Sequence, residues 1–517
     1  MKKFLSLLSL SFTMFFHAQQ NVVITNIQHP NEPSIIINPN NTQNIVVGEN
    51  SRRYFVSNDG GLTWTQKMIT SNFGYCCDPC LDADMNGNLY FFHLSNPNNG
   101  SWIDRIVCQK STNNGNSFDA VDSYTGLNST EKQDKQWSVI DNQNNIVYVT
   151  WTQFDQYGTP NPTKFSNILF SKSTDGGNTW SNPVQINETS GNCVDDDDTV
   201  EGAVPAVGPN GEVYVAWVGP AGLVFDKSTD HGQTWLQHDI VIDNMQGSGG
   251  WAYTIPGINR CDGLPITKCD LSNGPHRGNI YVNWSDQRNG TDNTDIWLAK
   301  SADGGNTWSA PIKVNNDNSN KHQFLTWMDI DQTTGYLYFV FYDRRNYNDN
   351  NTDVYMAVST DGGQTFINRK ISESPFIPNS GTFFGDYNNL SVHNGIVRPV
   401  WGRLHNGNQS LMTAILSQND LLSVPEEKIK ITDAKIYPVP SFNDVFVKYK
   451  LLKTESISIN IYDESGRLVK TPIKYQKRNQ GKNVEKLNLK ELNLSKGIYF
   501  IELSTSQYKK ALRMLKI

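Results

Sequence analysis

An octapeptide that recurs six times is the feature that most constrains how this chain can fold. Its pattern is Ser-x-Asp-x-Gly-x-Thr-Trp. Aspartate can accept hydrogen bonds from the backbone of a tight turn, glycine allows a positive φ angle, and the terminal aromatic ring can pack between sheets. The pattern therefore predicts a series of similar hairpin turns. The copies are SNDGGLTW (57–64), STNNGNSF (111–118), STDGGNTW (173–180), STDHGQTW (228–235), SADGGNTW (301–308) and STDGGQTF (359–366).

A second recurring unit lies ahead of the octapeptides and contains a short strand, a turn with Asn or Gly, and a strand that ends in aromatic residues. With an octapeptide, each unit would supply four strands, which is one blade of an all-β propeller. We expect seven blades in residues 21–420, with six as the alternative, and Val22–Asn26 could complete the last sheet and close the ring. The units begin at Pro33, Asp78, Trp137, Val204, Gly278, Trp327 and Tyr387, and the one at Gly278 lacks a clear first strand.

Charge and composition exclude several classes of protein. Charged residues make up only 18% of the chain, which argues against long amphipathic helices and coiled coils. The net charge is −7, and the acidic excess lies in residues 1–420. Because phosphate binding requires a Lys/Arg surface, we expect no nucleic-acid partner.

The first eighteen residues have the pattern of a secretory signal peptide. Lys2 and Lys3 precede an apolar run, and Ala18 stands at a plausible cleavage position. The run is too short to span a bilayer, and we expect no transmembrane segment in the mature chain. Export permits disulfides, and the seven cysteines all lie in the mature chain. Cys261 and Cys269 close a short loop and are the favoured pair, while Cys76, Cys77 and Cys80 could be zinc ligands.

The octapeptide resembles the Asp-box (BNR) repeat of the sialidase superfamily, whose members are β-propellers. The match covers most of residues 21–420, within a propeller predicted at residues 19–422. In that superfamily the boxes lie on the blade rim, away from the central pocket. The resemblance therefore implies a fold, and it implies a structural role for the box residues.

The C-terminal part reads as short alternating strands separated by turns. After a linker at residues 423–434, the motifs at Lys435–Pro440, Ile461–Val469 and Gly497–Leu503 resemble the C-terminal sorting domain of the type IX secretion system of Bacteroidetes. This resemblance implies that residues 435–517 engage the type IX secretion machinery. It also implies a secreted or cell-surface protein.

The resemblance to sialidases implies a set of catalytic residues. The segment Phe383–Gly395 is similar to the stretch around the sialidase nucleophile, which makes Tyr387 the candidate nucleophile with Asp386 beside it. Arg288 and Arg345 occupy positions like those of two arginines that hold the substrate carboxylate in sialidases, and we call them clamp arginines. Arginine suits this role because its planar guanidinium can pair with a carboxylate through two hydrogen bonds.

The chain also departs from the sialidase pattern. Asn31-Glu32-Pro33 stands where sialidases carry Arg-Ile-Pro, so the first clamp arginine is missing. No glutamate lies between Glu212 and Glu373, and Glu201 is the candidate for the residue that activates the tyrosine. Pairing of Arg288 and Arg345 with aspartates of their own loops is the alternative to the clamp.

Two further groups of polar residues are candidates for binding. Four consecutive aspartates supply the oxygen ligands that suit a structural Ca²⁺ ion, although a solvated acidic loop is the alternative. Asp134 and Lys135 precede a predicted inner strand, as does His322, and His322 or His276 could act as a general base. The four aspartates are Asp195, Asp196, Asp197 and Asp198.

Three functions are consistent with these features. The first is a sialidase-like glycoside hydrolase that acts on an acidic or complex glycan or glycoprotein and requires no cofactor. The second is a propeller that binds a glycan or a protein without catalysis. The third is a polysaccharide lyase that uses Tyr or His with Arg.

Overall fold

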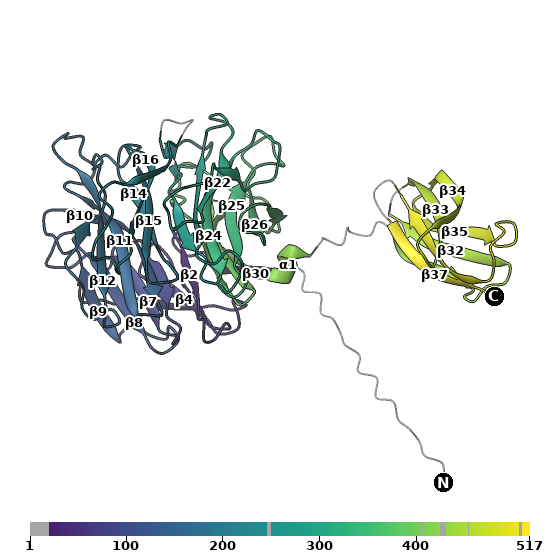
Figure 1. The fold of residues 1–517 in the computed structure, drawn as a ribbon, viewed down its shortest axis with the longest axis horizontal. Helices are drawn as coiled ribbons and strands as arrows, with labels where there is room; N and C mark the ends of the chain where they lie inside the picture. The colour runs from purple at the N-terminus through teal and green to yellow at the C-terminus, as the bar shows by residue number, and fades with distance from the viewer. Residues whose placement is uncertain (1–19, 246–249, 406, 424–430, 453, 506–508) are drawn as a thin grey trace, which may run out of the picture. The chain divides into compact units, whose positions relative to one another are not determined.

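The computed structural model describes residues 20–245, 250–405, 407–423, 431–452, 454–505 and 509–517 (Figure 1). The predicted signal peptide and residues 424–430 of the predicted linker lie outside the described residues. The chain divides into two compact units, Met1–Leu422 and Ser423–Ile517. Within the described part of the chain, no helix has the length and apolar character of a membrane span.

The described residues of the first unit form seven four-stranded antiparallel sheets and one small hairpin. The first sheet contains β2 (Ser34–Ile37), β3 (Ile45–Gly48), β4 (Arg53–Ser57) and β5 (Thr65–Met68). The second contains β6 (Cys80–Ala83), β7 (Leu89–Leu94), β8 (Ile106–Ser111) and β9 (Val121–Thr125). The third contains β10 (Lys132–Asp141), β11 (Ile146–Phe154), β12 (Ser166–Ser173) and β13 (Val184–Gln185). The fourth contains β14 (Glu201–Val207), β15 (Val213–Gly219), β16 (Gly222–Ser228) and β17 (Ile240–Asp243).

A two-stranded hairpin of β18 (Ala252–Tyr253) and β19 (Cys261–Asp262) precedes the last three sheets. The fifth sheet contains β20 (Ile266–Cys269), β21 (Ile280–Asp286), β22 (Asp295–Ser301) and β23 (Ile312–Lys313). The sixth contains β24 (Gln323–Asp331), β25 (Tyr336–Asp343), β26 (Asp353–Ser359) and β27 (Ile367–Lys370). The seventh contains β28 (Asn389–His393), β29 (Ile396–His405), β30 (Asn408–Ser417) and β1 (Gln20–Thr25), and α1 (Gln418–Leu422) follows it.

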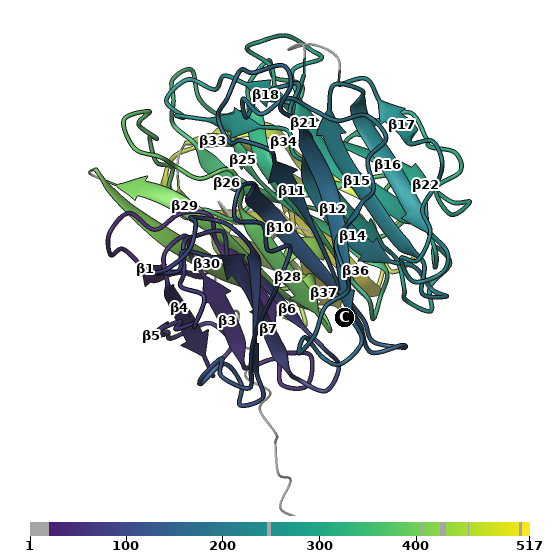
Figure 2. The same cartoon turned by 90° about the vertical axis from the view of Figure 1, so that its left-hand side faces the viewer.

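The first strands of the sheets form a closed ring. β2, β6, β10, β14, β20, β24 and β28 contact one another in this order, and β28 contacts β2 again. In Figure 2, β10, β14 and β28 lie toward the middle of this unit, whereas the outer strands β5 and β17 lie toward its edge. The arrangement is that of a β-propeller, as the repeats predict. The predicted closing strand is present, because β1 pairs antiparallel with β30 of the last sheet.

The octapeptides form the tight turns that the sequence predicts. In the copy that begins at Ser301, the serine hydroxyl donates to Asp303 Oδ1 (2.7 Å) and accepts the Gly305 backbone N–H (2.8 Å). The Asp303 carboxylate also accepts the N–H and the hydroxyl of Thr307. Trp308, the terminal aromatic, packs edge-on against Phe225 of the preceding sheet, with ring centroids 5.0 Å apart. This turn therefore fixes its own sheet and its contact with the preceding sheet.

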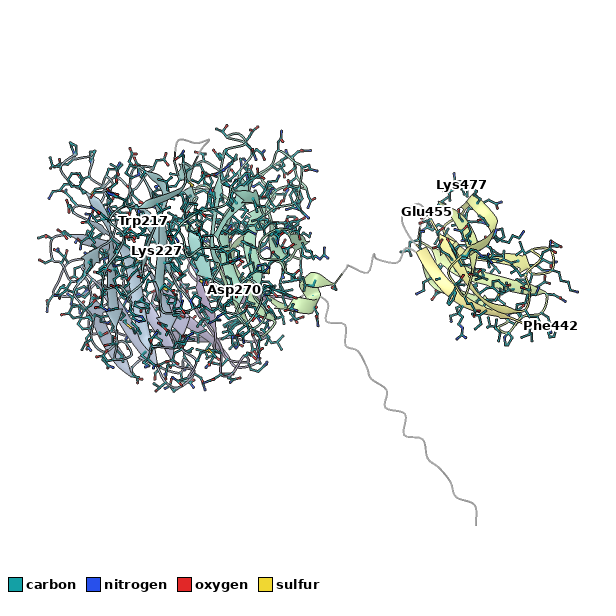
Figure 3. The ribbon with its side chains drawn as sticks, viewed as in Figure 1. Trp217, Lys227, Asp270, Phe442, Glu455 and Lys477 are labelled. Atoms are coloured by element: carbon teal, nitrogen blue, oxygen red, sulfur yellow. A yellow bond between two sulfur atoms is a disulfide. The ribbon has the colours of Figure 1, made fainter. Side chains whose placement is uncertain are left out.

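Large aromatic side chains fill the space between the sheets. Trp217, labelled in Figure 3, is buried in the fourth sheet, and tryptophans of three other sheets are equally buried. These are Trp151, Trp284 and Trp401. Because each sheet is covered on both faces, its central strands read as nearly continuous apolar runs.

The second unit is a small β-sandwich with its own core. One sheet contains β31 (Ile431–Tyr437), β32 (Asp444–Leu451) and β35 (Gly481–Asn488). The other contains β34 (Leu468–Arg478), β33 (Glu455–Asp463), β36 (Gly497–Ser504) and β37 (Lys509–Lys516). Alternate residues of β32 and β33 point into the core between the sheets, as the period of two predicts.

Candidate active site

The two mouths of the propeller differ in the side chains that they gather. Each octapeptide joins the third and fourth strands of an antiparallel sheet. The third strand runs in the same direction as the first, so the octapeptide lies at the end of the sheet where the first strand ends. The loops that precede the first strands lie at the opposite mouth. Charged side chains, most of them buried, gather there, and we call this group the carboxyl cluster. Its members are Glu32, Asp78, Asp134, Lys135, Asp195, Glu201, Arg260, Asp262 and Asp386.

Asp386 is the centre of the carboxyl cluster and is only 2% exposed. Lys135 Nζ lies 2.7 Å from Asp386 Oδ2, and Arg260 Nε donates to Asp386 Oδ1 at 2.8 Å. Arg260 Nη2 also bonds to Asp386 Oδ2, so the pair is bidentate. Burial raises the pKa of Asp386, but Lys135 and Arg260 outweigh this effect and lower it to about 2. Asp386 therefore stays ionised.

Bulges occur at the starts of three inner strands, and two of them carry side chains of the cluster. β10 loses register between Asp134 and Trp137, where Lys135 has a φ of 52°. β14 loses register after Glu201, where Gly202 has a φ of 77°. β24 has a similar irregularity after Phe324. Bulges re-aim side chains next to active sites, and here two of them carry Lys135 and Glu201.

Most carboxyl groups of the cluster resist ionisation. Burial, followed by the charges of neighbouring acids, raises the pKa of Asp134 and of Asp262 to about 8. Burial also raises the pKa of Glu32 and of Glu201 well above the ordinary value. Glu201 Oε1 is buried and has no hydrogen-bond partner within the described residues. The cluster therefore combines an ionised carboxylate, Asp386, with two carboxyl groups, Asp134 and Asp262, that hold protons at neutral pH.

The rim of the cluster is open to solvent. Arg260, whose side chain is 37% exposed, forms a second salt bridge of 2.8 Å with Asp195. Tyr157 donates its hydroxyl to Asp195 Oδ2 at 2.9 Å, and the Arg260 guanidinium lies 5.5 Å from the Phe383 ring centroid. Arg260 lies in the segment between β18 and β19, outside the repeat pattern. Sequence repeats could not have revealed it.

Tyr387, the predicted nucleophile, lies beneath the cluster and is 7% exposed. Its ring packs against Trp137 and Trp327, with centroids 5.0 and 6.3 Å away. These three residues line a cavity of about 20 Å³ together with Asp262 and Asp386. Burial, followed by the charges of Asp78 and Glu32, raises the pKa of the Tyr387 hydroxyl well above its ordinary value. Tyr387 therefore needs a nearby base to lose its proton.

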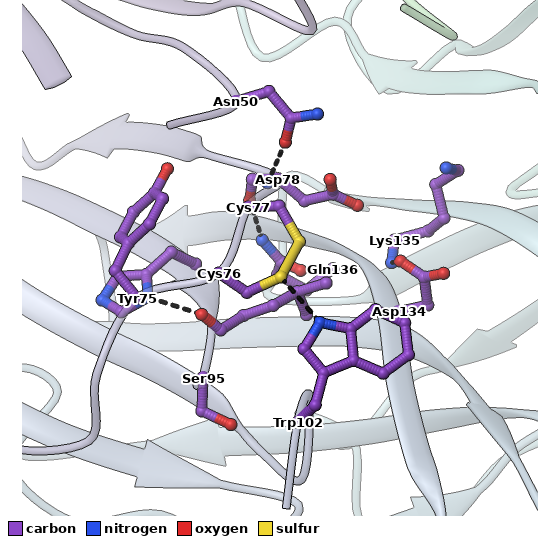
Figure 4. Close-up of a disulfide and its surroundings, with 12 residues drawn as sticks. Asn50, Tyr75, Cys76, Cys77, Asp78, Ser95, Trp102, Asp134, Lys135 and Gln136 are labelled. Carbon is purple, nitrogen blue, oxygen red and sulfur yellow. Dashed lines mark hydrogen bonds between the residues drawn. A yellow bond between two sulfur atoms is a disulfide. The ribbon is translucent and has the colours of Figure 1, made fainter. Parts of the chain in front are cut away.

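A disulfide joins the adjacent residues Cys76 and Cys77 beside the cluster (Figure 4). The predicted bridge between Cys261 and Cys269 is wrong, because both are buried free cysteines on β19 and β20. Their closeness in sequence does not pair them, since each lies in a separate β-ladder. The zinc interpretation of Cys76, Cys77 and Cys80 is also wrong, because the first two form the disulfide and Cys80 lies in β6 with its sulfur 3.5 Å from Ser138 Oγ.

Arg288 and Arg345 lie on the loops that follow β21 and β25, where they pair with aspartates other than Asp386. Arg288 pairs with Asp286 of its own loop and with Asp243 of the outer strand β17. Arg345 pairs with Asp343 at 2.7 Å and donates to Asn368 of the outer strand β27. Both guanidinium groups therefore have partners within or beside their own sheets, as the alternative prediction states. Of the candidate catalytic residues, Tyr387, Asp386 and Glu201 come together at the cluster.

Three of the four consecutive aspartates have different partners. Asp195 pairs with Arg260, Asp196 accepts the Asn192 side-chain amide, and Asp197 accepts the Ala252 backbone N–H at 2.6 Å. Within the described ranges, no group of three or more His, Cys, Asp or Glu side chains is arranged to hold a metal ion. The arrangement does not fit a calcium site, and calcium binding stays a prediction.

The two histidines lie outside the cluster. His322 Nδ1 lies 3.1 Å from Thr294 Oγ1, and burial lowers its pKa to about 4. His276 lies against Gly362 of an octapeptide, at the opposite mouth. That mouth contains a cavity of about 230 Å³, in which Lys268 Nζ lies 3.2 Å from Asp329 Oδ1. Asp82 lines the same cavity, and burial raises its pKa to about 7.

Residues 435–516 match the family described as the secretion system C-terminal sorting domain. The chain carries a type IX sorting domain. This domain directs the protein through type IX secretion to the cell surface or the extracellular space. No curated protein matches the chain significantly.

Several solved structures resemble the chain at low identity. A Hadza microbial sialidase is 13% identical, with 73% of this chain and 74% of that one covered and a TM-score of 0.41. An ulvan lyase (PL25) bound to -[GlcA(1-4)Rha3S]- is 12% identical, with coverage of 77% and 96% and a TM-score of 0.44. The NanB sialidase from Streptococcus pneumoniae is 10% identical, with coverage of 73% and 84% and a TM-score of 0.42. Likenesses of this size say nothing about the reaction.

Proposed function

We propose that this protein is a secreted glycoside hydrolase whose active site is the carboxyl cluster. The observation that carries the proposal is the convergence of Lys135, Arg260 and Tyr387 on one ionised carboxylate, Asp386, among protonated carboxyl groups. These residues come from separate loops at one mouth of the ring. Paired carboxyl groups with pKa values driven apart are what acid/base catalysis of glycoside cleavage requires.

Asp134 is the proposed proton donor. It is 9% exposed, and its pKa of about 8 keeps it protonated at neutral pH. Its carboxyl group is near that of Asp78, and two acids that close together favour sharing a proton. Its Oδ1 accepts the Lys135 backbone N–H at 2.8 Å, which holds the side chain in place. Asp134 can thus protonate the glycosidic oxygen as the bond to the leaving sugar breaks.

Tyr387 is the proposed nucleophile, by resemblance to sialidases. Its hydroxyl lies within electrostatic reach of Asp78, which could accept the phenolic proton as the oxygen attacks the anomeric carbon. Water would then release the sugar with Asp134 acting as the base. Glu201 stands across the cluster, where it interacts with Lys135 and Asp134. We assign it a role in setting the charge of the site.

The pairing of both cations with aspartates favours a neutral glycan over an acidic one. Among the described residues of the cluster, seven carboxyl groups surround two cations, and both cations are held by aspartates. An anionic sugar would have to displace Asp386 or Asp195 from Arg260. Arg288 and Arg345 are held by aspartates of their own loops and are not assigned to substrate.

A binding protein without catalysis is the second candidate. The burial of Tyr387, and the locking of Asp386 by two cations, are the observations that favour it. A rigid ion network can support a binding surface without any proton transfer.

The test is sugar release from a panel of neutral and sialylated glycans by the full mature chain. Asp134→Asn and Tyr387→Phe should each abolish the appearance of new reducing ends. Asp82→Asn, which changes a half-buried carboxyl group that lines the cavity at the other mouth, should retain the parent rate. Saturable binding without release would favour the second candidate, and an unsaturated sugar product would replace hydrolysis by elimination.

A further inference from the structure

We propose that Trp102 and the Cys76–Cys77 disulfide form a platform that binds the apolar face of a sugar ring next to the carboxyl cluster. The proposal rests on the proposed function and adds a binding subsite to it. The platform contains no catalytic group. Its role is to hold the glycan so that the bond to be cleaved lies over Asp134.

The platform is built from an exposed aromatic ring and a disulfide that contact each other. Trp102 is 45% exposed, although most tryptophans of the propeller are buried. Its indole N–H donates to Cys76 Sγ at 3.1 Å (Figure 4). This contact occupies the only polar group of the indole, so the exposed ring presents an apolar surface. Exposed apolar patches rimmed by polar residues mark sites that bind ligands.

Several contacts hold Trp102 in place. The Tyr157 ring meets it edge-on, with centroids 5.9 Å apart. Lys132 Nζ donates to the Trp102 backbone carbonyl at 2.8 Å. A ring that is fixed before the ligand arrives loses little conformational entropy on binding. This rigidity distinguishes Trp102 from an aromatic side chain that is exposed by chance.

The platform is continuous with the carboxyl cluster. Gln133, the residue before Asp134, donates its backbone N–H to the Ile103 carbonyl at 2.9 Å, which ties the Trp102 loop to the start of β10. Cys77 precedes Asp78, whose backbone carbonyl accepts the Gln136 side-chain amide of the same strand. Tyr157 in turn bonds to Asp195 of the cluster. The platform thus borders Asp78 and Asp134.

The chemistry of this border matches a sugar ring. A sugar ring has C–H groups on its faces and hydroxyl groups around its edge. The indole and the disulfide offer contacts to the C–H groups, while carboxyl groups beside them offer hydrogen bonds to the hydroxyls. A lipid or a purely apolar peptide would leave those carboxyl groups without partners, which is unfavourable.

The experiment measures binding rather than turnover, in the full mature chain with Asp134→Asn to stop hydrolysis. Cellohexaose, xylohexaose, mannohexaose, arabinohexaose and chitohexaose are titrated by isothermal calorimetry. At least one should bind, and adding Trp102→Ala should weaken it by about tenfold or more. Trp102→Phe should retain most of the affinity. Met85→Ala, which removes a side chain 54% exposed at the opposite mouth, should change it by less than about twofold.

Two results would overturn the platform. One is equal affinity of the Trp102→Ala and parent proteins, and the other is absence of binding by every oligosaccharide in the panel. The failure of the proposed function is separate, because it would appear as binding without sugar release by the protein that retains Asp134. Hydrolysis with unaltered affinity in Trp102→Ala would refute the platform alone.

Discussion

Replacing Asp134 with asparagine should stabilise the protein at neutral pH while it removes the proposed proton donor. Asparagine resembles the protonated acid, because its oxygen can still accept the Lys135 backbone N–H at 2.8 Å. Its amide can donate to Asp78, as a shared carboxyl proton does. The variant cannot ionise, so folding no longer forces a buried acid to keep its proton.

The magnitude follows from the pKa of Asp134, which is raised from 3.8 to about 8 on folding. Because the pKa of Asp134 is higher in the folded state, its contribution to the unfolding free energy is fully present below pH 3.8. This contribution decreases as the pH rises and is lost above about pH 8. About three pKa units separate 3.8 from pH 7, which corresponds to at most about 4 kcal/mol of unfolding free energy. The variant should gain up to this amount over the parent between pH 4 and pH 7.

Urea unfolding at several pH values between 4 and 8 measures this gain. The difference in unfolding free energy between Asp134→Asn and the parent should increase steadily with pH. Asp198→Asn, which changes an exposed carboxylate nearby, should show no such increase. A difference that is independent of pH would show that Asp134 is already ionised in the folded protein and would refute the reasoning.

Three further predictions concern other parts of the chain. Asp386→Asn should destabilise the protein by about 3–5 kcal/mol in urea unfolding, because it leaves the buried Lys135 without its ion-pair partner; a loss below about 1 kcal/mol would contradict the ion network. Ser301→Ala removes both hydrogen bonds of a buried octapeptide hydroxyl and should cost about 1–3 kcal/mol with catalysis unchanged. A reduced rate would place that turn nearer the active site than its strand connections allow. Deletion of residues 435–517 should leave the protein inside the producing cells in a fractionation experiment, and its normal appearance outside would contradict the sorting role.

The fold was largely predictable from the sequence because the repeats are local. Each octapeptide satisfies its own hydrogen bonds within eight residues, as Ser301 does with Asp303 and Gly305. Such a turn can therefore be predicted without knowledge of the rest of the chain. The closing strand was predictable for a related reason. The apolar strand at the start of the chain precedes the first repeat unit, so it can pair only with the last sheet of the ring, as β1 does with β30.

The candidate site was only partly predictable, because its contacts join residues far apart in the sequence. Lys135 and Asp386 are 251 positions apart, and Arg260 lies outside the repeats. Tyr387 and Asp386 could be predicted because they precede an inner strand, in a segment whose local sequence resembles the stretch around the sialidase nucleophile. Arg288 and Arg345 were ambiguous, because an aspartate two residues before each arginine predicts a local ion pair as well as a clamp. The structure shows those local pairs.

The central claim is that Asp134 protonates the leaving group, and paired aryl glycosides test it most directly. The sugar is taken from the glycan that the parent enzyme hydrolyses. A phenyl glycoside needs protonation to leave, because phenolate is a basic leaving group, whereas a dinitrophenyl glycoside departs without it. Asp134→Asn should lose at least about 100-fold in kcat/KM on the first and retain most of the parent rate on the second. Equal losses on both substrates, or no loss on either, would contradict the account.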